Sequence, residues 1–558
     1  MLPKENHKSR IKPKFRHLDF GAICRSFWCK FQLESYYSKI RQFRVLVLWL
    51  LLALSNRSYA QFTDRFWAFG DSAAIDFKNL SNPIPDSSIL RVRGTCASIC
   101  DSNGNLLMYC GSPNQDIWRP PGPPYIYDDG FMVNKYNNII SNGDSLKCNL
   151  GYQEMTIIPN PSNLNQLYVF TAGVLTPPLP MGFFYNIVDL SLNNDSGYVI
   201  QKNVPLASFQ VGDGVATVKH GNGRDWWVLF RPWDINVANN TFYLYLATPQ
   251  GLSGPFIQNV GSYVTSGGGF RRNEFSKDGT KLFTTTTTSL IEYYDFNRCT
   301  GLISNPINIS QAALQTPFIK YWSLAVSPDK GKIYVTTTNT GASSDSSFLI
   351  QFDLNNSNIL NSADTLLGLK RPQEFENMQL GPDDKLYICT MFTDNDGCFD
   401  YLYCDSTRNQ TNSYLSVVNY PDSLGAACDF QPFSFYLGGK RAYCGLPNNP
   451  NYELGPLAGS ICDTLTVGIT ENAMYNNNII VYYDGDWKTA FINAKNLRGK
   501  NFKFELFNIN GQLIKQESGK LISEFYTQNL DMSSFADNIY IVRLITEKEV
   551  LTTRFIKR

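Results

Sequence analysis

The stretches FSKDGTKLFTT (275–285), VSPDKGKIYVTT (326–337) and LGPDDKLYICT (380–390) repeat one pattern along the chain. In each, a hydrophobic residue precedes a short polar turn with Asp or Gly, and a Lys and a strand-like run follow. Asp and Gly adopt the backbone angles of tight turns at little steric cost, and apolar and β-branched residues favour strands. The pattern therefore predicts β-hairpins that recur at a regular interval.

Four weaker copies extend the pattern: DSNGNLLMYC (101–110), PNPSNLNQLYVF (159–170), KHGNGRDWWVLF (219–230) and YLGGKRAYCG (436–445). The first strand residues after the seven turns are Leu106, Leu167, Trp226, Leu282, Ile333, Leu386 and Ala442. They are 51 to 61 residues apart, a length that suits a four-stranded β-propeller blade. Two β-sandwiches or a solenoid are the alternatives, but neither requires seven turns at near-regular spacing. We predict an all-β fold with a β-propeller, seven blades being favoured.

The composition is that of a globular β protein. Of 558 residues, 43% are hydrophobic, 14% aromatic and 17% charged, which excludes a largely disordered chain. The formal net charge of +1 hides a basic segment at 1–60 and a mildly acidic remainder. Because phosphate binding needs a basic patch, we expect no nucleic-acid partner.

Residues 1–60 are predicted to form an N-terminal extension and signal peptide. An apolar run at 45–54 follows basic residues, and Ser58-Tyr59-Ala60 places small residues before a cut between Ala60 and Gln61. The run is short for a bilayer, which needs about 20 apolar residues. A retained anchor is the alternative.

Eleven of the 13 cysteines follow Ala60. In an exported protein some disulfides are expected, and an odd number leaves at least one thiol outside intramolecular pairs. Local pairing is possible within two groups, namely Cys96, Cys100 and Cys110, and Cys389, Cys398 and Cys404. No C-x-x-C pair is present, so a structural zinc site is not indicated, and we predict no metal and no cofactor.

The propeller is expected to span residues 61–462. A ring of blades leaves an open edge unless the two ends of the chain share a blade. The aromatic, strand-like stretch at 66–77 is therefore expected to complete the last blade beside strands at 432–439 and 441–447. Residues 463–477 are polar and irregular, which predicts a linker to a separate domain at 478–558.

The last domain is predicted to be a small Ig-like β-sandwich. FKFELFNINGQLIKQ (502–516) alternates in its first half, and Asn510-Gly511 is a strong hairpin turn. Further strands are predicted in SEFYTQNL (523–530), NIYIVRLI (538–545) and VLTTRFIKR (550–558). Six or so strands in about 80 residues suit a sandwich.

This tail resembles the type A sorting domain of type IX secretion, which occurs on exported proteins of Bacteroidetes. The resemblance rests on NGQL (510–513), LDMS (530–533), NIYIV (538–542) and the closing RFIK (554–557). Its motif residues in this chain are Asn510, Gly511, Tyr540, Val542, Arg554 and Lys557. Asn538 stands where the family usually has Gly, and YYDG (482–485) replaces the usual entry. The resemblance implies that the type IX secretion machinery is a partner and that the tail is normally cleaved, with release or lipopolysaccharide attachment.

The body also resembles surface propellers of the same bacteria. WAFG (67–70) and AIDF (74–77) are similar to their opening, and GLPN (445–448) is similar to their closing segment. The resemblance covers most of residues 61–450 and implies the fold. It brings no agreed activity with it.

No catalytic residue is predicted. His220 is the single histidine after Ala60, and it lies in a turn where a solvated side chain is expected, without a nucleophile motif. A propeller-type glycosidase with two acidic residues is the alternative function, although SKDG (276–279) lacks the spacing of the sialidase repeat. The acidic loop DNDG (394–397) with Asp400 suits calcium by its oxygens but lacks the full twelve-residue pattern, which favours a simple turn.

Two proline-rich insertions, DIWRPPGPPYIYDDG (116–130) and TPPLPMGFF (176–184), suggest a ligand rim. Prolines stiffen such loops, and Trp118, Tyr125 and Tyr127, with Trp233, could line a rim for a glycan or a protein. Ordinary packing between blades is the alternative. We therefore expect an exported, non-enzymatic propeller for binding or display, secreted or on the outer-membrane surface.

Overall fold

The computed structural model describes residues 62–113, 130–148, 151–173, 182–234, 236–264, 271–310, 320–338, 346–392, 410–460, 462–463, 479–484, 488–494, 497–509, 511–521 and 526–557. These residues form strands almost throughout, as predicted. The helical turns are α2 (Leu192–Asp195), η3 (Ile359–Ser362), α4 (Gln410–Ser413) and η4 (Gly425–Cys428). Within the described ranges, no helix has the length and apolar character to cross a membrane.

Five antiparallel sheets have four strands each, in chain order from the first strand to the fourth. Their strands are β6 (Met155–Pro159), β7 (Gln166–Gly173), β8 (Gly182–Asp189) and β9 (Tyr198–Ala207); β10 (Ala216–Lys219), β11 (Trp226–Phe230), β12 (Asn239–Thr248) and β13 (Gly251–Val264); β14 (Arg271–Phe275), β15 (Lys281–Thr286), β16 (Leu290–Phe296) and β17 (Ile303–Asn308); β18 (Lys320–Val326), β19 (Lys332–Thr338), β20 (Ser346–Asp353) and β21 (Asp364–Lys370); β22 (Gln373–Leu380), β23 (Leu386–Phe392), β24 (Tyr414–Val418) and β25 (Phe430–Tyr436).

A sixth, five-stranded sheet supplies two blades because its central strand is long and changes partners. It consists of β1 (Phe66–Phe69), β2 (Asp71–Asp76), β3 (Ile84–Cys100), β4 (Leu106–Pro113) and β5 (Phe131–Asn134). The first half of β3 pairs with β2 and is largely exposed, whereas the second half pairs with β4 and is buried. The outer strand of one blade thus continues as the first strand of the next, which gives seven blades among the described residues.

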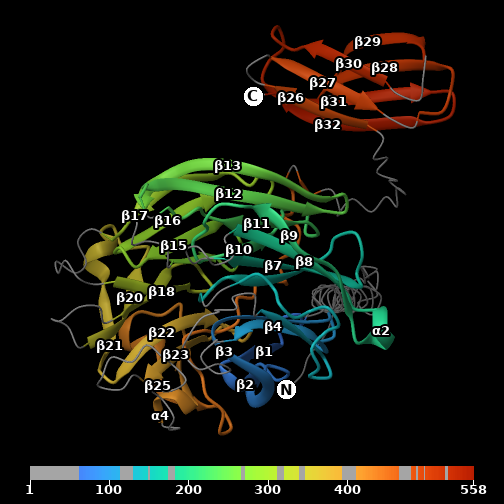
Figure 1. Cartoon of the computed structure of the whole chain (residues 1–558). Helices are drawn as coiled ribbons and strands as arrows, with labels where there is room; N and C mark the ends of the chain where they lie inside the picture. The colour runs from blue at the N-terminus through green and yellow to red at the C-terminus, as the bar shows by residue number, and fades with distance from the viewer. Residues whose placement is uncertain are drawn as a thin grey trace, which may run out of the picture. The chain divides into compact units, whose positions relative to one another are not determined.

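The blades follow one another in chain order around a ring (Figure 1). The first strands of successive blades contact each other, from β3 to β6, β10, β14, β18 and β22. The ring closes where β1 and β2 pack on the β22–β25 blade. There the Trp67 and Phe77 rings lie 5.8 and 5.6 Å from the Tyr387 ring, in one buried cluster.

The quoted turn motifs form the hairpins that were predicted. Between β14 and β15, Ser276 N donates to Lys281 O at 3.0 Å, and the Asp278 side chain accepts from Thr280 N at 3.0 Å. Gly279 has φ +71°, which explains the glycine at this position. The turn between β18 and β19 repeats the arrangement with Ser327 and Asp329.

The seventh predicted repeat is wrong. Six of the seven positions lie at or next to the start of the second strand of a blade, but Ala442 lies in a buried segment without a strand. β25 is the outer strand of a complete blade, so it does not share a sheet with β1 and β2. Gly438 and Gly439, both with positive φ, turn the chain away from β25. The segment after β25 meets β2 through isolated bridges of Arg441 with Asp71 and Ser72 and through an ion pair of Arg441 with Asp71 at 2.9 Å.

The C-terminal domain is a sandwich of two antiparallel sheets, as predicted. One sheet has the order β26 (Ile479–Asp484), β27 (Thr489–Ala494), β30 (Tyr526–Asp531), and the other β29 (Leu513–Lys520), β28 (Asn501–Asn508), β31 (Asn538–Thr546), β32 (Val550–Lys557). Alternate residues of β28 and β31, such as Phe504, Leu506, Tyr540 and Val542, build its buried core. Period-two burial of this kind is what fixes strand register.

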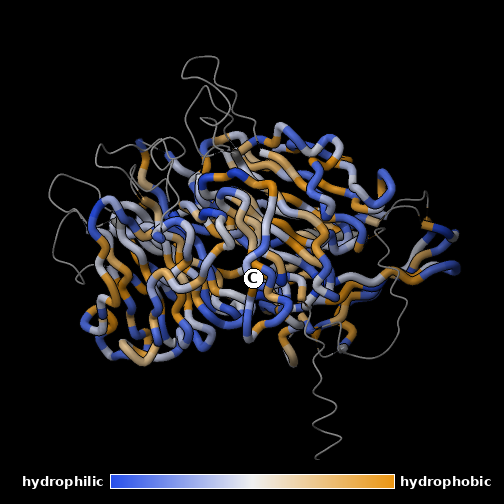
Figure 2. The backbone as a smooth tube through the Cα atoms, turned by 90° about the horizontal axis from the view of Figure 1, so that it is seen from below, coloured by the Kyte–Doolittle hydropathy of each residue, from blue (hydrophilic) through white to orange (hydrophobic). Residues whose placement is uncertain are grey.

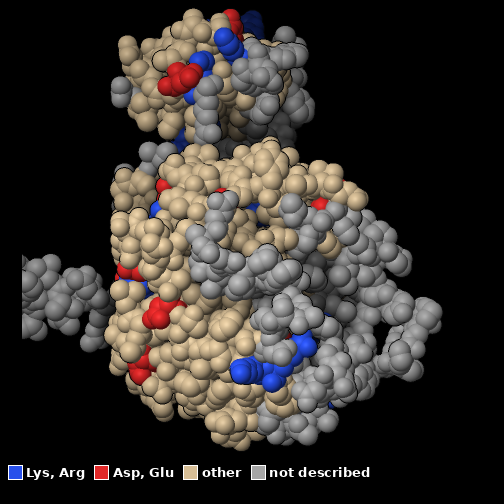
Figure 3. All heavy atoms as spheres, turned by 90° about the vertical axis from the view of Figure 1, so that its left-hand side faces the viewer, with Lys and Arg blue, Asp and Glu red and all other residues tan. Residues whose placement is uncertain are grey.

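The hydropathy of the described residues also varies along the backbone. Hydrophobic and hydrophilic stretches alternate along the described backbone (Figure 2). On the face in Figure 3, Lys, Arg, Asp and Glu side chains are scattered and most described atoms belong to uncharged residues. This face has no extended basic surface in its described part.

Candidate ligand site at the propeller axis

Three of the first strands carry a β-bulge, which on β3 lies at the start of the half that pairs with β4. On β3, residues 93–95 face one residue of β4; on β18, residues 322 and 323 face one residue of β19; and on β22, residues 376 and 377 face one residue of β23. Extra residues of this kind break the ladder locally and re-aim a side chain, and they are common next to functional sites. Because all three lie on inner strands, we call the side chains there the axial cluster.

The axial cluster consists of Arg93, Tyr152, Trp322, Glu374 and Glu376. The Arg93 guanidinium lies over the Tyr152 ring, with 5.4 Å between its Cζ and the ring centroid. The Tyr152 and Trp322 rings meet edge to face at 4.6 Å. These three side chains are partly exposed, whereas Glu374 and Glu376 are 7% and 4% exposed. The cluster thus has an accessible aromatic and cationic side and a buried acidic side.

Burial raises the pKa of Glu376 well above its ordinary value, and the neighbouring charge of Glu374 adds to the effect. The Trp322 side chain hydrogen bonds to Glu376, and the positive charge of Arg93 acts in the same, pKa-lowering direction. Next to the cluster, burial raises the pKa of Asp213 to about 6 although Asp213 accepts from Tyr152 N, Gln153 N and Gly214 N. Carboxyl groups with raised pKa values in a converging site are typical of functional sites.

A second group of buried charges supports the cluster from β14 and β22. Arg272, 2% exposed, donates from Nη2 to Glu274 at 2.9 Å and to the Gln379 side chain at 2.5 Å. Burial raises the pKa of Glu274, and Arg272 opposes this. These partners keep the arginine in place, so β14 and β22 are joined by side chains as well as by packing.

The chain after β25 passes along the axis of the propeller. Cys444 N donates to Arg93 O at 3.0 Å, and Asn377 N donates to Cys444 O at 3.3 Å, so this segment joins β3 to β22. Its continuation, Asn448, donates to Met155 O at 2.9 Å and to Val215 O at 2.8 Å and accepts from Gln153 at 2.9 Å. We call residues 441–460 the axial segment.

The axial segment crosses to the other end of the first strands. Tyr452 Oη donates to Ile157 O at 2.8 Å, Lys219 Nζ donates to Tyr452 O at 2.5 Å, and Leu457 N donates to Gly221 O at 2.7 Å. Residues 441–450 are buried throughout. The axis is therefore filled by the chain's own residues, and the axial cluster has the axial segment as its floor.

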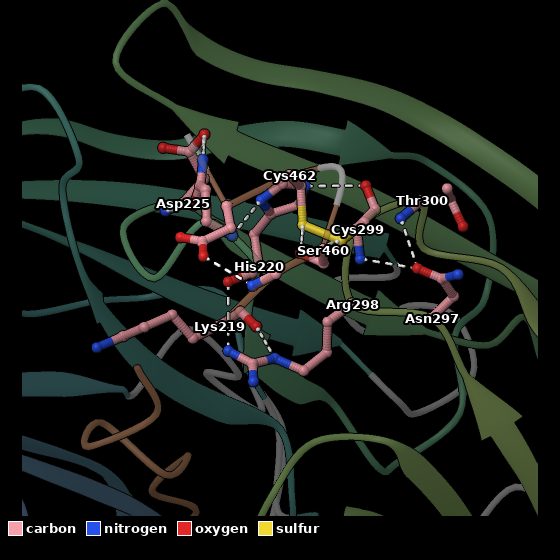
Figure 4. The surroundings of a disulfide bond; sticks show 12 residues. Lys219, His220, Asp225, Asn297, Arg298, Cys299, Thr300, Ser460 and Cys462 are labelled. Carbon is pink, nitrogen blue, oxygen red and sulfur yellow. Dashed lines mark hydrogen bonds between the residues drawn. A yellow bond between two sulfur atoms is a disulfide. The ribbon is translucent and has the colours of Figure 1, made fainter. Parts of the chain in front are cut away.

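A disulfide joins Cys462, just after the axial segment, to Cys299 in the turn between β16 and β17 (Figure 4). His220 lies beside it: Nε2 hydrogen bonds to Cys299 O at 2.9 Å, and Nδ1 accepts from Asn222 N at 3.1 Å. His220 is 9% exposed, so the expectation of a solvated histidine was wrong, and both ring nitrogens are engaged in local structure. Arg298 donates to Lys219 O at 2.8 Å and to Gly455 O at 2.7 Å and strengthens the same junction.

The predicted presence of a disulfide is confirmed, but the local pairing was wrong for the described cysteines. Cys96, Cys100, Cys110 and Cys389 are buried thiols. Cys398 and Cys404 lie outside the described residues, as does the acidic loop at 394–400. In the ranges the structure describes, no group of three or more His, Cys, Asp or Glu side chains could hold a metal ion.

The predicted ligand rim stays a prediction. Trp118, Tyr125 and Tyr127 lie outside the described residues, as do Ala60 and Gln61 at the expected cleavage site. Trp233 is partly exposed, and its main-chain N donates to Gln210 O at 3.0 Å. Pro113, the last described residue before the insertion at 114–129, faces Val92, the neighbour of Arg93.

The residues of the axial cluster were not found from the sequence, although a signal exists. Trp322 and Glu376 lie seven residues before the turn aspartates Asp329 and Asp383, and Arg271 of β14, outside the cluster, lies seven residues before Asp278. Alignment of the repeats on this aspartate places the three side chains at one level of successive first strands. Without the bulges, however, nothing in the sequence separates them from ordinary strand residues.

The predicted motif of the C-terminal domain divides into core and surface residues. Tyr540 and Val542 are buried, and Lys557, 8% exposed, donates from Nζ to Asp537 at 2.6 Å. Arg554 is exposed, and Gly511 has φ +76° in the turn between β28 and β29. Asn510 lies outside the described residues. Most of the motif thus maintains the fold of the domain.

Residues 488–558 match the model of the secretion system C-terminal sorting domain. No curated protein matches the chain. Among solved structures, the periplasmic gluconolactonase of Pseudomonas aeruginosa is 11% identical, with 68% of this chain and 98% of that chain covered and a TM-score of 0.40. The Cps50 (Swd1) β-propeller domain of Myceliophthora thermophila is 10% identical over 59% of this chain and 93% of that chain, with a TM-score of 0.30.

A quinoprotein alcohol dehydrogenase-like protein of Bacteroides thetaiotaomicron is 12% identical, over 65% of this chain and 74% of that chain, with a TM-score of 0.34. Likeness at this level carries no functional argument, and the propeller assignment here rests on the sheets themselves. The chain is thus a type IX secretion substrate, secreted or attached to the cell surface, in which a β-propeller precedes a secretion system C-terminal sorting domain.

Proposed function

We propose that this is a non-enzymatic binding protein whose propeller holds a ligand at the axial cluster, while the C-terminal domain acts as the sorting signal. The observation that carries the proposal is the set of three bulges on the inner strands β3, β18 and β22. A bulge disrupts the ladder and is retained where it re-aims a side chain, and three on inner strands point to one shared site. Passive display alone would not need them.

The ligand is proposed to be a glycan or a protein on the outside of the cell. The partly exposed Arg93, Tyr152 and Trp322 are of the residue types that dominate binding sites, since they combine a large contact area with a polar group. After sorting, the chain is proposed to be released or joined to lipopolysaccharide, so that the cluster meets extracellular partners.

An array of glycans and proteins tests this function. The full secreted chain should bind one class of ligand without turnover, and Arg93→Ala should weaken that binding at least tenfold. The matched control is Arg91→Ala, because Arg91 is exposed and faces Asp71 of β2, outside the bulge at 93–95. Binding that both variants retain equally would contradict the assignment of the site, and a complete lack of binding would contradict the function.

Glycoside hydrolysis is the second candidate, and the Glu374 and Glu376 pair is the observation that favours it. A glycosidase needs one protonated and one ionised carboxyl group, and the raised pKa of Glu376 beside Glu374 suits the role of the acid. Chromatography of oligosaccharides after incubation with the chain decides between the two. Products that disappear in Glu376→Gln would establish the enzyme and overturn the non-enzymatic proposal.

The role of the C-terminal domain is tested by deletion of residues 478–558. The deletion removes all seven strands of the sandwich and leaves the disulfide at Cys462 intact. The expected result is retention of the propeller inside the cell envelope. Normal amounts of the truncated chain outside the cell would contradict the role of the domain as sorting signal.

A further inference from the structure

Three buried polar atoms around the axial cluster have no hydrogen-bond partner within the described chain. They are Nε of Arg93, Nδ2 of Asn377 and Oε2 of Glu376. Asn377 and Glu376 are adjacent in the bulge of β22, at 3% and 4% exposure. Their neighbourhood is shared, because Cys444 bonds to the main chains of both Arg93 and Asn377 and because Arg93 interacts electrostatically with Glu376.

The three atoms differ in kind. The Arg93 and Asn377 nitrogens are donors, whereas the Glu376 oxygen accepts when the carboxyl group is ionised and can also donate when it is protonated, the form that its raised pKa favours. A purely anionic ligand satisfies only donors, and an ammonium group satisfies only acceptors. A hydroxyl group both donates and accepts, so several neighbouring hydroxyls meet all three needs at once.

The accessible side of the cluster is aromatic. The Tyr152 and Trp322 rings lie edge to face at 4.6 Å and are both partly exposed. An exposed aromatic face accepts the C–H groups of an apolar ligand surface, and a pyranose ring presents C–H groups on its faces and hydroxyls at its rim. The buried polar atoms and the partly exposed rings therefore suit the same molecule.

From these observations we propose that the axial cluster binds a sugar unit, with its hydroxyls bonded to Glu376, Asn377 and Arg93 and its ring against Trp322 and Tyr152. This inference rests on the proposed function, since it names the ligand class of the same site. No bond is made or broken in the complex. Specificity comes from the donor and acceptor pattern, because a ligand that lacks the hydroxyls leaves buried groups unpaired.

Calorimetric titration of the full secreted chain with a panel of neutral oligosaccharides, acetate and methylammonium tests the inference. The expected result is binding of at least one oligosaccharide and none of the ions. Glu376→Gln and Trp322→Ala should each weaken the sugar at least tenfold. The matched aromatic control is Tyr263→Ala, since Tyr263 is 69% exposed on the outer strand β13 and should bind as the original chain does.

The outcomes separate this inference from the proposed function. Binding of acetate or methylammonium that depends on Arg93 or Glu376 would keep the site and overturn its sugar class. Sugar binding that survives both Glu376→Gln and Trp322→Ala would overturn the placement. If no probe binds, the sugar inference fails, while a protein ligand that depends on Arg93 would still support the proposed function. Urea unfolding of each variant shows whether a loss of binding reflects a loss of fold.

Discussion

The side chain of Gln153 donates to Oδ1 of Asn448 at 2.9 Å. This bond joins the residues just before β6 to the axial segment. The Nδ2 group of Asn448 donates to Met155 O in β6 and to Val215 O just before β10. This one side chain, which is 7% exposed, thus bonds to two blades. The axial segment is therefore part of the propeller's structure, and the cluster above it depends on that segment.

Asn448→Ala is expected to destabilise the propeller by about 3 kcal/mol, because it removes three buried hydrogen bonds, to Met155 O, to Val215 O and from Gln153, at about 1 kcal/mol or more each. Urea unfolding measures the change. Asn451→Ala is the control: Asn451 makes one bond to Lys277 O and one to Glu453 N near the surface, so its loss should cost about 1 kcal/mol or less. Equal effects of the two variants would argue against the role of Asn448.

Removal of the Cys299–Cys462 disulfide is expected to cost about 2 to 5 kcal/mol, since it closes a long loop and anchors the end of the axial segment. The paired variant Cys299→Ser with Cys462→Ser should unfold at lower urea concentration than the original chain. Dithiothreitol should shift the original chain to the same midpoint and leave the paired variant unchanged. An effect of the reductant on the paired variant would show that another disulfide contributes.

The stability of the propeller should fall between pH 4 and pH 8 because of Asp64. Burial raises the pKa of Asp64 to about 7, while Asn449 and Trp67 donate to it at 2.6 and 2.9 Å. A folded-state pKa above the unfolded value of 3.8 means that the contribution to stability is complete below pH 4 and lost as the pH rises through 7.

Asp64→Asn keeps an acceptor for both donors and removes the titration. We compare the free energy of unfolding of the variant with that of the original chain. The difference, variant minus original, should increase by up to about 4 kcal/mol from pH 4 to pH 8, at about 1.4 kcal/mol per pKa unit. Chemical unfolding at both pH values measures this difference. A difference that is the same at pH 4 and pH 8 would contradict the raised pKa.

Tyr540→Ala is expected to unfold the sorting domain and to stop export. The ring is 3% exposed and stacks on Phe555 at 5.6 Å, and its hydroxyl donates to Ala536 O at 2.6 Å. Truncation of a buried aromatic side chain costs about 3 to 5 kcal/mol, which is much of the stability of a small domain. Immunoblots of cells and medium measure export, and the exposed Thr552→Ala should be exported normally.

The fold was predictable wherever local turn chemistry decides it. The turns at Asp278, Asp329 and Asp383 follow from short-range hydrogen bonds and from one positive-φ residue each, and all three hairpins form as predicted. The seventh repeat failed at Ala442 because the same local pattern there is overruled by a buried path along the axis. Long-range packing of this kind leaves no periodic trace in the sequence.

The site was less predictable than the fold. The bulges that re-aim Arg93, Trp322 and Glu376 are properties of strand pairing, which sequence spacing alone does not reveal. The motif of the C-terminal domain could be recognised from the sequence. Tyr540 and Val542 are two residues apart on β31, and both side chains are buried in the core. The sorting role was therefore assigned from residues, whereas the ligand site needed the three-dimensional pairing.

Hydrogen–deuterium exchange with and without the ligand selected by the array tests the central claim, that the propeller binds at its axial cluster, most directly. The account predicts slower exchange in peptides that cover the N-terminal half of β22, β18 and the second half of β3, because these carry the three bulges. The peptides of the outer strands β13 and β17 should exchange at the same rate in both states. Protection confined to those outer strands, with β3, β18 and β22 unchanged, would contradict it.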